Sequence, residues 1–180
     1  INDSSGAVTL AGVDRASVLI NAGGADGISI SQAGNVLISD LRITGGNRGI
    51  ESQSGNLAVS NVDSSGLIGA GIAVFNAGNV FVTNSTLNNN NNGLFVTDSG
   101  TVTVTNVLAS NNVVDGLRVV RSGTATFTNV TATNNRDRTA TVSWSDNSDN
   151  ESSFQIEREK QNKRGAWGGA KSSWFSVISL

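Results

Sequence analysis

The chain has 180 residues, a formal net charge of −2, and neither histidine nor cysteine. Without cysteine there is no disulfide, thiolate nucleophile or cysteine metal site. Without histidine the commonest general base and the usual zinc ligand are missing. A slightly acidic chain lacks the basic footprint of a nucleic-acid-binding protein, and no apolar run approaches the roughly 18 residues of a membrane span. We therefore expect no nucleic-acid partner, no membrane span, no metal and no cofactor.

The middle of the chain repeats every 22 or 23 residues, and each unit begins at a glycine. These glycines are Gly27, Gly49, Gly71, Gly93 and Gly116. A second glycine recurs within the units, at Gly34, Gly55, Gly78, Gly100 and Gly123. A residue that tolerates a positive φ also recurs, at Asp40, Asn61, Asn84, Asn106 and Asn129. A repeat this regular indicates a stack of like units in which each unit contacts its neighbours.

Between these marks each unit has three short runs in which β-branched and apolar residues alternate, which predicts three strands per unit. Each run pairs with the same run one unit later, so the strands are parallel and the coils of the solenoid lie about 4.8 Å apart. The alternation predicts the following aliphatic interior, strand by strand: Ile28, Ile30, Ile50, Ile72, Val74, Leu94, Val96, Leu117 and Val119; Val36, Ile38, Leu57, Val59, Val80, Val82, Val102, Val104, Ala125 and Phe127; Leu41, Ile43, Val62, Leu87, Val107, Ala109, Val130 and Ala132.

Over roughly residues 6 to 138 this repeat resembles the right-handed parallel β-helix of the pectate-lyase-like class. The column of Asp40 and the four asparagines resembles the asparagine ladder of that class, which occupies the tight turn between the second and third strands. We therefore predict an all-β fold, a single right-handed parallel β-helix of about five to six coils over residues 1–138. We expect the ladder to be structural, with buried amides that bond the coils above and below.

The composition changes after residue 138, because every lysine and tryptophan lies beyond it. The stretch 140–159 resembles the second and third strands of a fibronectin type III domain. The residues that carry this resemblance are Trp144, Asp146, Asn147, Asn150, Glu151, Phe154, Ile156, Glu157 and Arg158. A complete sandwich needs roughly 100 residues, so 139–180 form at most a short β-rich appendage. It is either a hairpin that caps the solenoid or a pairing element of a homodimer, which we favour. The incomplete domain also suggests a piece of a longer protein.

Enzymes of the resembled class use the outer side of the first strand and its flanking loops. There, Asp98 and Arg121 share a register in adjacent coils and should face each other. Together with Asp115 and Arg118 they are the candidate catalytic residues, and a surface ion pair is the alternative that we favour. The catalytic patterns of polygalacturonases and pectate lyases are not met, because histidine is absent and the acidic residues nearby are too few.

Three phenylalanines, Phe75, Phe95 and Phe81, are candidate binding residues, because exposed aromatic rings stack on sugars. Lateral packing or a dimer contact is the alternative. Abundant Asn, Thr, Ser and Gly with few Lys and no Cys are typical of an exported bacterial protein, secreted or at the cell surface. We predict a non-catalytic structural or adhesive module with carbohydrate as its candidate partner. The alternative is a polysaccharide-active enzyme, either a lyase, a glycoside hydrolase or a carbohydrate esterase.

Overall fold

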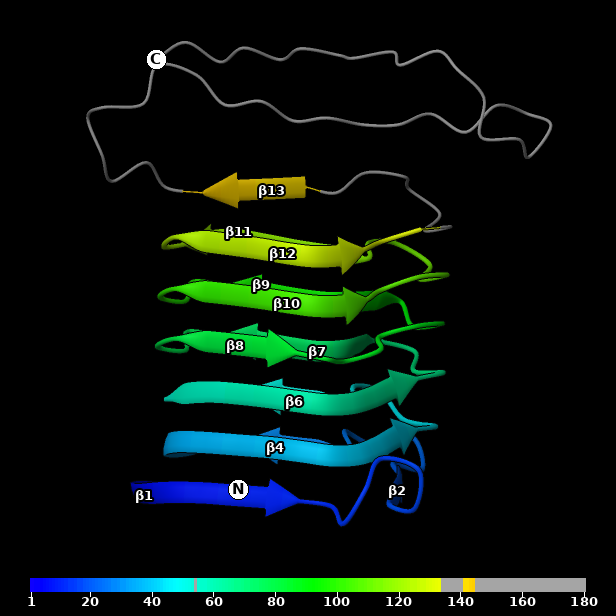
Figure 1. Cartoon of the computed structure of the whole chain (residues 1–180). Helices are drawn as coiled ribbons and strands as arrows, with labels where there is room; N and C mark the ends of the chain where they lie inside the picture. Colours follow the sequence, from blue (N-terminus) through cyan, green and yellow to red (C-terminus); the bar gives the residue numbers. More distant parts are fainter. Residues whose placement is uncertain (54, 134–140, 145–180) are drawn as a thin grey trace, which may run out of the picture. The chain divides into compact units, whose positions relative to one another are not determined.

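The computed structural model describes residues 1–53, 55–133 and 141–144, which all belong to one unit of the chain, Ile1–Ser145. Within these ranges every regular element is a β-strand. No helix in them is long and apolar enough to pass through a membrane. The strands wind upward from the N-terminus, one coil above another (Figure 1). The all-β fold that the repeat predicts is therefore confirmed.

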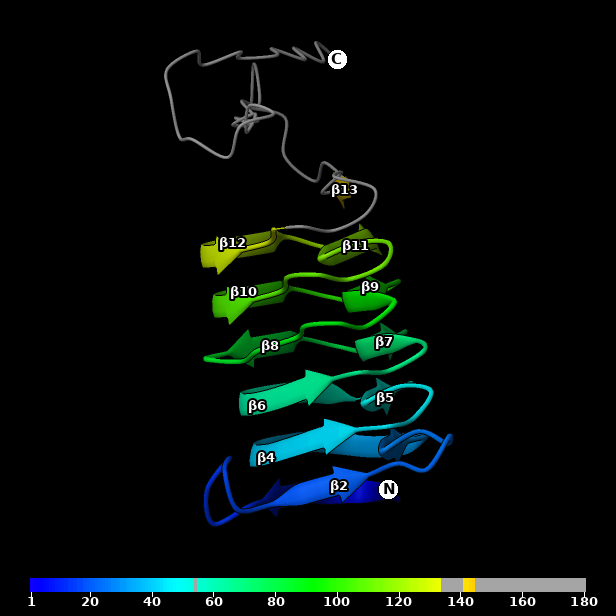
Figure 2. The same cartoon turned by 90° about the vertical axis from the view of Figure 1, so that its right-hand side faces the viewer.

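The strands form two parallel sheets, which Figure 2 shows as two adjacent columns. In the described residues, sheet A contains β1 (Asn2–Ala11), β4 (Gln32–Thr44), β6 (Asn56–Ser65), β8 (Val80–Thr83), β10 (Val102–Leu108) and β12 (Ala125–Thr131), with β2 (Leu19–Asn21) beside β4. Sheet B contains β3 (Ile28–Ile30), β5 (Ile50–Ser52), β7 (Ala70–Phe75), β9 (Asn92–Thr97), β11 (Leu117–Ser122) and β13 (Thr141–Trp144). Each coil contributes one strand to each sheet, so equivalent residues of successive coils lie directly above one another.

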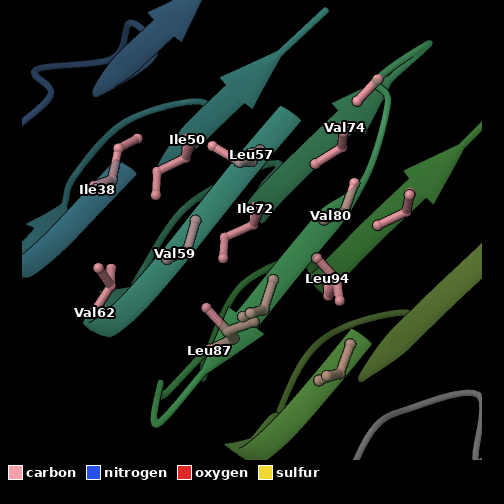
Figure 3. Packing of buried hydrophobic residues seen from close by; sticks show 14 of the residues in the cluster. Ile38, Ile50, Leu57, Val59, Val62, Ile72, Val74, Val80, Leu87 and Leu94 are labelled. Carbon is pink, nitrogen blue, oxygen red and sulfur yellow. The ribbon is translucent and has the colours of Figure 1, made fainter. Parts of the chain in front are cut away.

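The interior consists of stacked aliphatic columns between the two sheets (Figure 3). One column runs along sheet B through Ile28, Ile50, Ile72, Leu94 and Leu117, each paired in register with the next. All five side chains are buried. Full burial of such a side chain stabilises the fold by about 1.5–3 kcal/mol relative to exposure, so the stack of columns is the main source of stability.

The predicted interior positions are buried throughout the first four units, and the exceptions lie in the last one. Ala125, Phe127 and Val130 are only half-buried, because β12 is the last described strand of sheet A. Ala132 is exposed, so its predicted inward position is wrong. The equivalent Ala109 also follows the last residue of its strand and is fully buried, so the difference is that Ala132 belongs to the last coil of sheet A in the described residues.

The second and third predicted strands are one continuous strand in β4, β6, β10 and β12, bent at a single residue. Asp40, Asn61, Asn106 and Asn129 form these bends with φ between 50° and 58°. Their side chains bond from coil to coil, as in the 2.6 Å bond from Asn61 Nδ2 to Asp40 Oδ1 and the 2.8 Å bond from Asn129 Nδ2 to Asn106 Oδ1.

This column lies at the surface, so the expectation that its amides are buried is wrong. Asn106 is exposed, whereas Val104 and Val107 on either side of it point inward and are buried. A bend between two inward side chains leaves the residue at its corner on the outside. The column can therefore join neighbouring coils, but it does not fill the interior.

The buried amides belong to Asn90 and Asn112, in the loops that lead back to sheet B. They are 1% and 2% exposed. Asn90 accepts a bond from the Leu67 amide (3.1 Å) and donates to the Ser64 carbonyl (2.9 Å). Asn112 Oδ1 accepts from the Asn90 amide (3.0 Å), and its Nδ2 donates to the Leu87 carbonyl (3.0 Å). These two side chains satisfy backbone groups that burial would otherwise leave unpaired.

The glycines that begin the units are required by the close approach of the next coil. A methyl group on Gly93 would lie 2.3 Å from the carbonyl oxygen of Gly116, and one on Gly71 would lie 2.7 Å from that of Gly93. Each glycine therefore leaves room for the backbone of the next one. The period of the sequence repeat is the period of this contact.

Sheet B continues beyond residue 138, since β13 pairs in parallel with β11. Residues 134–140 and 145–180 lie outside the described part of the chain. The rest of the fibronectin-like stretch, the capping hairpin and the cross-chain pairing of residues 139–180 fall there. They and the boundary at residue 138 stay predictions.

Candidate functional site

The outer side of sheet B carries the candidate catalytic residues and two of the three phenylalanines. Its central column is Ser29, Glu51, Ala73, Phe95 and Arg118, paired in register from coil to coil. We call this surface the sheet B face. It comprises Asp26, Ser29, Arg48, Glu51, Gln53, Ala73, Phe75, Phe95, Thr97, Asp98, Asp115, Arg118 and Arg121.

Two aromatic rings occupy the middle of the sheet B face. Phe75 and Phe95 lie with their ring centroids 5.7 Å apart and their planes tilted by 58°. The guanidinium of Arg48 lies 5.5 Å from the centre of the Phe75 ring, and that of Arg118 lies 5.8 Å from the centre of the Phe95 ring. Both distances are within the range of a cation–π contact. The four side chains thus form one row, with an arginine at each end.

A charged cluster lies beside Phe75, centred on Arg48. The Arg48 guanidinium pairs with Glu51 at 2.5 Å and with Asp26 at 3.6 Å. Glu51 also accepts bonds from Gln53 Nε2 (3.0 Å) and Ser29 Oγ (3.4 Å), and it is only 8% exposed. The carboxylate of Glu51 is therefore already occupied by donors from three side chains of the chain itself.

A second ion pair joins Asp98 and Arg121 at the end of the strands. Arg121 donates from Nε to Asp98 Oδ1 and from Nη2 to Oδ2, both at 2.7 Å. The side chain of Thr97 also bonds both partners. The hydrogen bond from Arg121, followed by that from Thr97, lowers the pKa of Asp98 to about 2. Because both side chains are largely exposed, the pair itself contributes little to stability.

The third ion pair joins Asp115 and Arg118 at the start of β11, with 3.7 Å between Nη1 and Oδ2. Asp115 is buried, whereas Arg118 is exposed and covers Phe95. The four candidate catalytic residues therefore occur as two separate pairs, toward opposite ends of β11. The sequence correctly predicted that Asp98 and Arg121 are neighbours in register, but the four candidate residues do not form a single site.

This arrangement is better suited to contact than to proton transfer. Asp98 is ionised at neutral pH, so it cannot act as a general acid there. Glu51 and Asp115 are each held by an arginine. In the described residues, no group of three or more Asp, Glu, His or Cys side chains could hold a metal ion. What the face offers a ligand is aromatic surface and arginine N–H groups.

Phe81 does not join the other two phenylalanines. It lies on β8 in sheet A, whereas Phe75 and Phe95 belong to β7 and β9 in sheet B (Figure 2). Conversely, the sequence reasoning did not single out Arg48 and Asp26. Both precede a unit glycine, as Asp115 does, so aligning the residue before that glycine would have shown a charge in three of the five units.

Parallel coils, aliphatic columns and a polar outer surface define a β-solenoid of the parallel β-helix class. Residues 2–155 match the family model described as right handed beta helix region, and the chain belongs to this family. The predicted right-handed parallel β-helix is thereby confirmed. Neither a curated protein nor a solved structure matches the chain.

Proposed function

We propose that this chain is a non-catalytic structural or adhesive module that contacts carbohydrate through the sheet B face. The row Arg48–Phe75–Phe95–Arg118 carries this proposal. Aromatic rings pack against the apolar faces of sugar rings, and the arginines on either side supply donors for hydroxyl oxygens. The row crosses several coils, so it suits an extended polymer better than a single small molecule.

The charges of the face favour a neutral polysaccharide. Its three arginines (Arg48, Arg118 and Arg121) stand against four carboxylates (Asp26, Glu51, Asp98 and Asp115), so its formal charge is −1. Each arginine is already paired with at least one carboxylate. An acidic polymer would therefore meet repulsion and no uncompensated cation.

Surface display or secretion from a bacterium is part of the same proposal. It is supported by the composition, rich in Asn, Thr, Ser and Gly and free of Cys. A chain with this composition needs no reducing environment, and a solenoid with polar outer faces suits a spacer or adhesin.

The proposal is tested by affinity electrophoresis or calorimetry of the whole chain with neutral and acidic polysaccharides. We expect Phe75→Ala combined with Phe95→Ala to weaken binding of a neutral polysaccharide about tenfold or more, because stacking is lost from both rings. Val113→Ala is the control, since Val113 is exposed and lies outside the face. Melting temperatures identify any loss caused by unfolding. Unchanged binding by the double variant would exclude the sheet B face as the contact surface.

The alternative is a polysaccharide-active enzyme that works at the buried Asp115 beside Arg118. Incubation with polysaccharides and simple esters, followed by assays for new reducing ends, unsaturated products and released acid, distinguishes it. Product formation that Asp115→Asn abolishes would replace the binding module with this alternative.

A further inference from the structure

The outer side of sheet A carries three columns of outward positions, with one residue from each of six strands in every column. The central column is paired in register from Thr9 to Thr126. Figure 1 shows these strands stacked one above another with little twist. We call this surface the sheet A face. Its columns are Ala7, Asn35, Asn56, Asn79, Thr101 and Thr124; Thr9, Leu37, Ala58, Phe81, Thr103 and Thr126; and Ala11, Ser39, Ser60, Thr83, Thr105 and Thr128.

The sheet A face contains no charged residue, although 14% of the chain is charged and more than half of the sheet B face is. Arg15 lies at one edge, where its Nη1 is 3.5 Å from the carbonyl oxygen of Asn84. Depletion of charge around an aromatic residue is typical of the centre of a protein–protein interface. The face also has no charge that would repel an identical surface.

The centre of the face has a projecting ring next to a shallow place. Leu37 and Phe81 are 39% and 44% exposed, and the small side chain of Ala58 lies between them in the same column. A hollow of about 350 Å³ is open around Ala58. Ala58 lies on β6 and Phe81 on β8, the two middle strands of the six. The ring and the hollow therefore lie on either side of the centre of the face, at equal distances from it.

A two-fold axis parallel to the strands, midway between β6 and β8, makes use of this arrangement. It sets β6 of one copy against β8 of the other, β4 against β10 and β1 against β12, so that all six strands overlap. In the same register each Phe81 ring meets Ala58 of the second copy. Asn56 likewise meets Asn79, and two amides can pair because each both donates and accepts.

We propose that the sheet A face binds the same face of a second copy of this chain in this register. Such an isologous contact needs a self-complementary surface, and the ring and hollow provide one. The two flat sheets lie face to face, about 10 Å apart. The contact involves neither the sheet B face nor residues 139–180, so it is independent of the proposed function and of cross-chain pairing through that segment.

The size of the face predicts a weak dimer. Six strands about 4.8 Å apart, each contributing five residues of about 3.3 Å, make a surface of roughly 500 Å². Two copies then bury roughly 1,000 Å² together, which is the lower limit for a biological interface. We therefore expect a reversible dimer whose dissociation constant is on the order of micromolar. This constant should change little with salt concentration, because the face is uncharged.

Sedimentation velocity of the whole chain, over concentrations on either side of this value, measures the association. Ala58→Phe sets a ring against each Phe81 ring and should abolish the dimer by steric overlap. Phe81→Ala sets a small residue against each Ala58 and should weaken the dimer about tenfold or more, because the central aromatic contact is lost. Ile68→Ala is the matched control and should change nothing, since Ile68 is 77% exposed and lies outside the face.

A mixture of these two variants gives the sharpest test. The first variant has a ring at both central positions, and the second has a small residue at both. Only the mixed pair sets a ring against a hollow twice, so the mixture should associate about as tightly as the unsubstituted chain, although neither variant does so alone. Melting curves by circular dichroism establish that both variants are folded.

Three results would overturn the proposal. The first is a chain that stays monomeric well above micromolar concentration. The second is a dimer that Ala58→Phe leaves intact, which would place the contact elsewhere, for example in residues 139–180. The third is a mixture that associates no better than its components. Polysaccharide binding by the sheet B face is measured separately with Phe75→Ala and Phe95→Ala, so either proposal can fail without the other.

Discussion

The outer sides of sheets A and B are built on the same coils, yet they carry different chemistry. The sheet B face has ion pairs around two phenylalanines, whereas the outer side of sheet A around Leu37, Ala58 and Phe81 has amides and apolar residues and no charged residue. Inward positions must stack on a like residue in the next coil, which restricts them to aliphatic side chains. Outward positions are restricted much less, so two unrelated surfaces can share one interior.

Both outer surfaces depend on the shared interior, so a variant that destroys the interior should remove both of them. Val104 is fully buried in β10, and Val104→Asp places an unpaired carboxylate among aliphatic side chains. We expect a loss of more than about 3 kcal/mol of unfolding free energy, with binding at the sheet B face lost as well. Urea denaturation followed by circular dichroism measures this. Thr103→Asp, one residue away and facing outward, is the control and should change stability by far less.

A more local break targets sheet B at Gly93, the second residue of β9. A methyl group on Gly93 would overlap the carbonyl oxygen of Gly116, so Gly93→Ala should cost about 1–3 kcal/mol through overpacking. At Gly123 the nearest atom to such a methyl is 3.3 Å away, and Gly123→Ala should cost much less. Equal effects in thermal unfolding would show that the coils do not approach as closely as described.

Buried and exposed amides give a third comparison. Asn90→Ala removes the partner of the Leu67 amide and the Ser64 carbonyl, both inside the molecule. We expect a loss of about 1–3 kcal/mol, because buried polar groups are left unpaired. Asn106→Ala removes an exposed amide, whose former partners can bond water, and should cost less than about 1 kcal/mol. The reverse order in chemical denaturation would restore the expectation that the Asn106 column is the buried one.

The smallest expected effect is a pH dependence of stability that comes from Asp98 on the sheet B face. The folded pKa of Asp98 is about 2, below its ordinary value of 3.8. A depressed carboxyl pKa contributes stability that is present above pH 3.8 and is lost as the pH falls toward 2. Asp98→Asn should therefore remove a small part of the decrease in melting temperature over this range.

The sequence was sufficient for the features that repeat. The spacing of the glycines determines the length of a coil, and the alternation identifies columns such as Ile28–Ile50–Ile72. Register alone also places Asp98 next to Arg121, because both occupy the same position in neighbouring coils.

Features that cross columns were not predictable in this way. Arg48 reaches from the loop before β5 to Glu51 and to the ring of Phe75, and the rotamers of long side chains decide such contacts. The exposure of Asn106 depends on the geometry of a bend, which alternation cannot describe. Asn90 and Asn112 lie in loops, where the sequence has no period that distinguishes inward from outward.

Because every rung of both sheets is parallel, the hydrogen bonds between coils point along the axis of the solenoid. Tension between β1 and β12 would load the interfaces between coils in series, so all of them carry the same force and the weakest one yields first. Each released coil of 22 residues adds about 75 Å of extended chain. An anchor built in this way would absorb a sudden pull by lengthening in steps, and it would rewind coil upon coil when the load is removed.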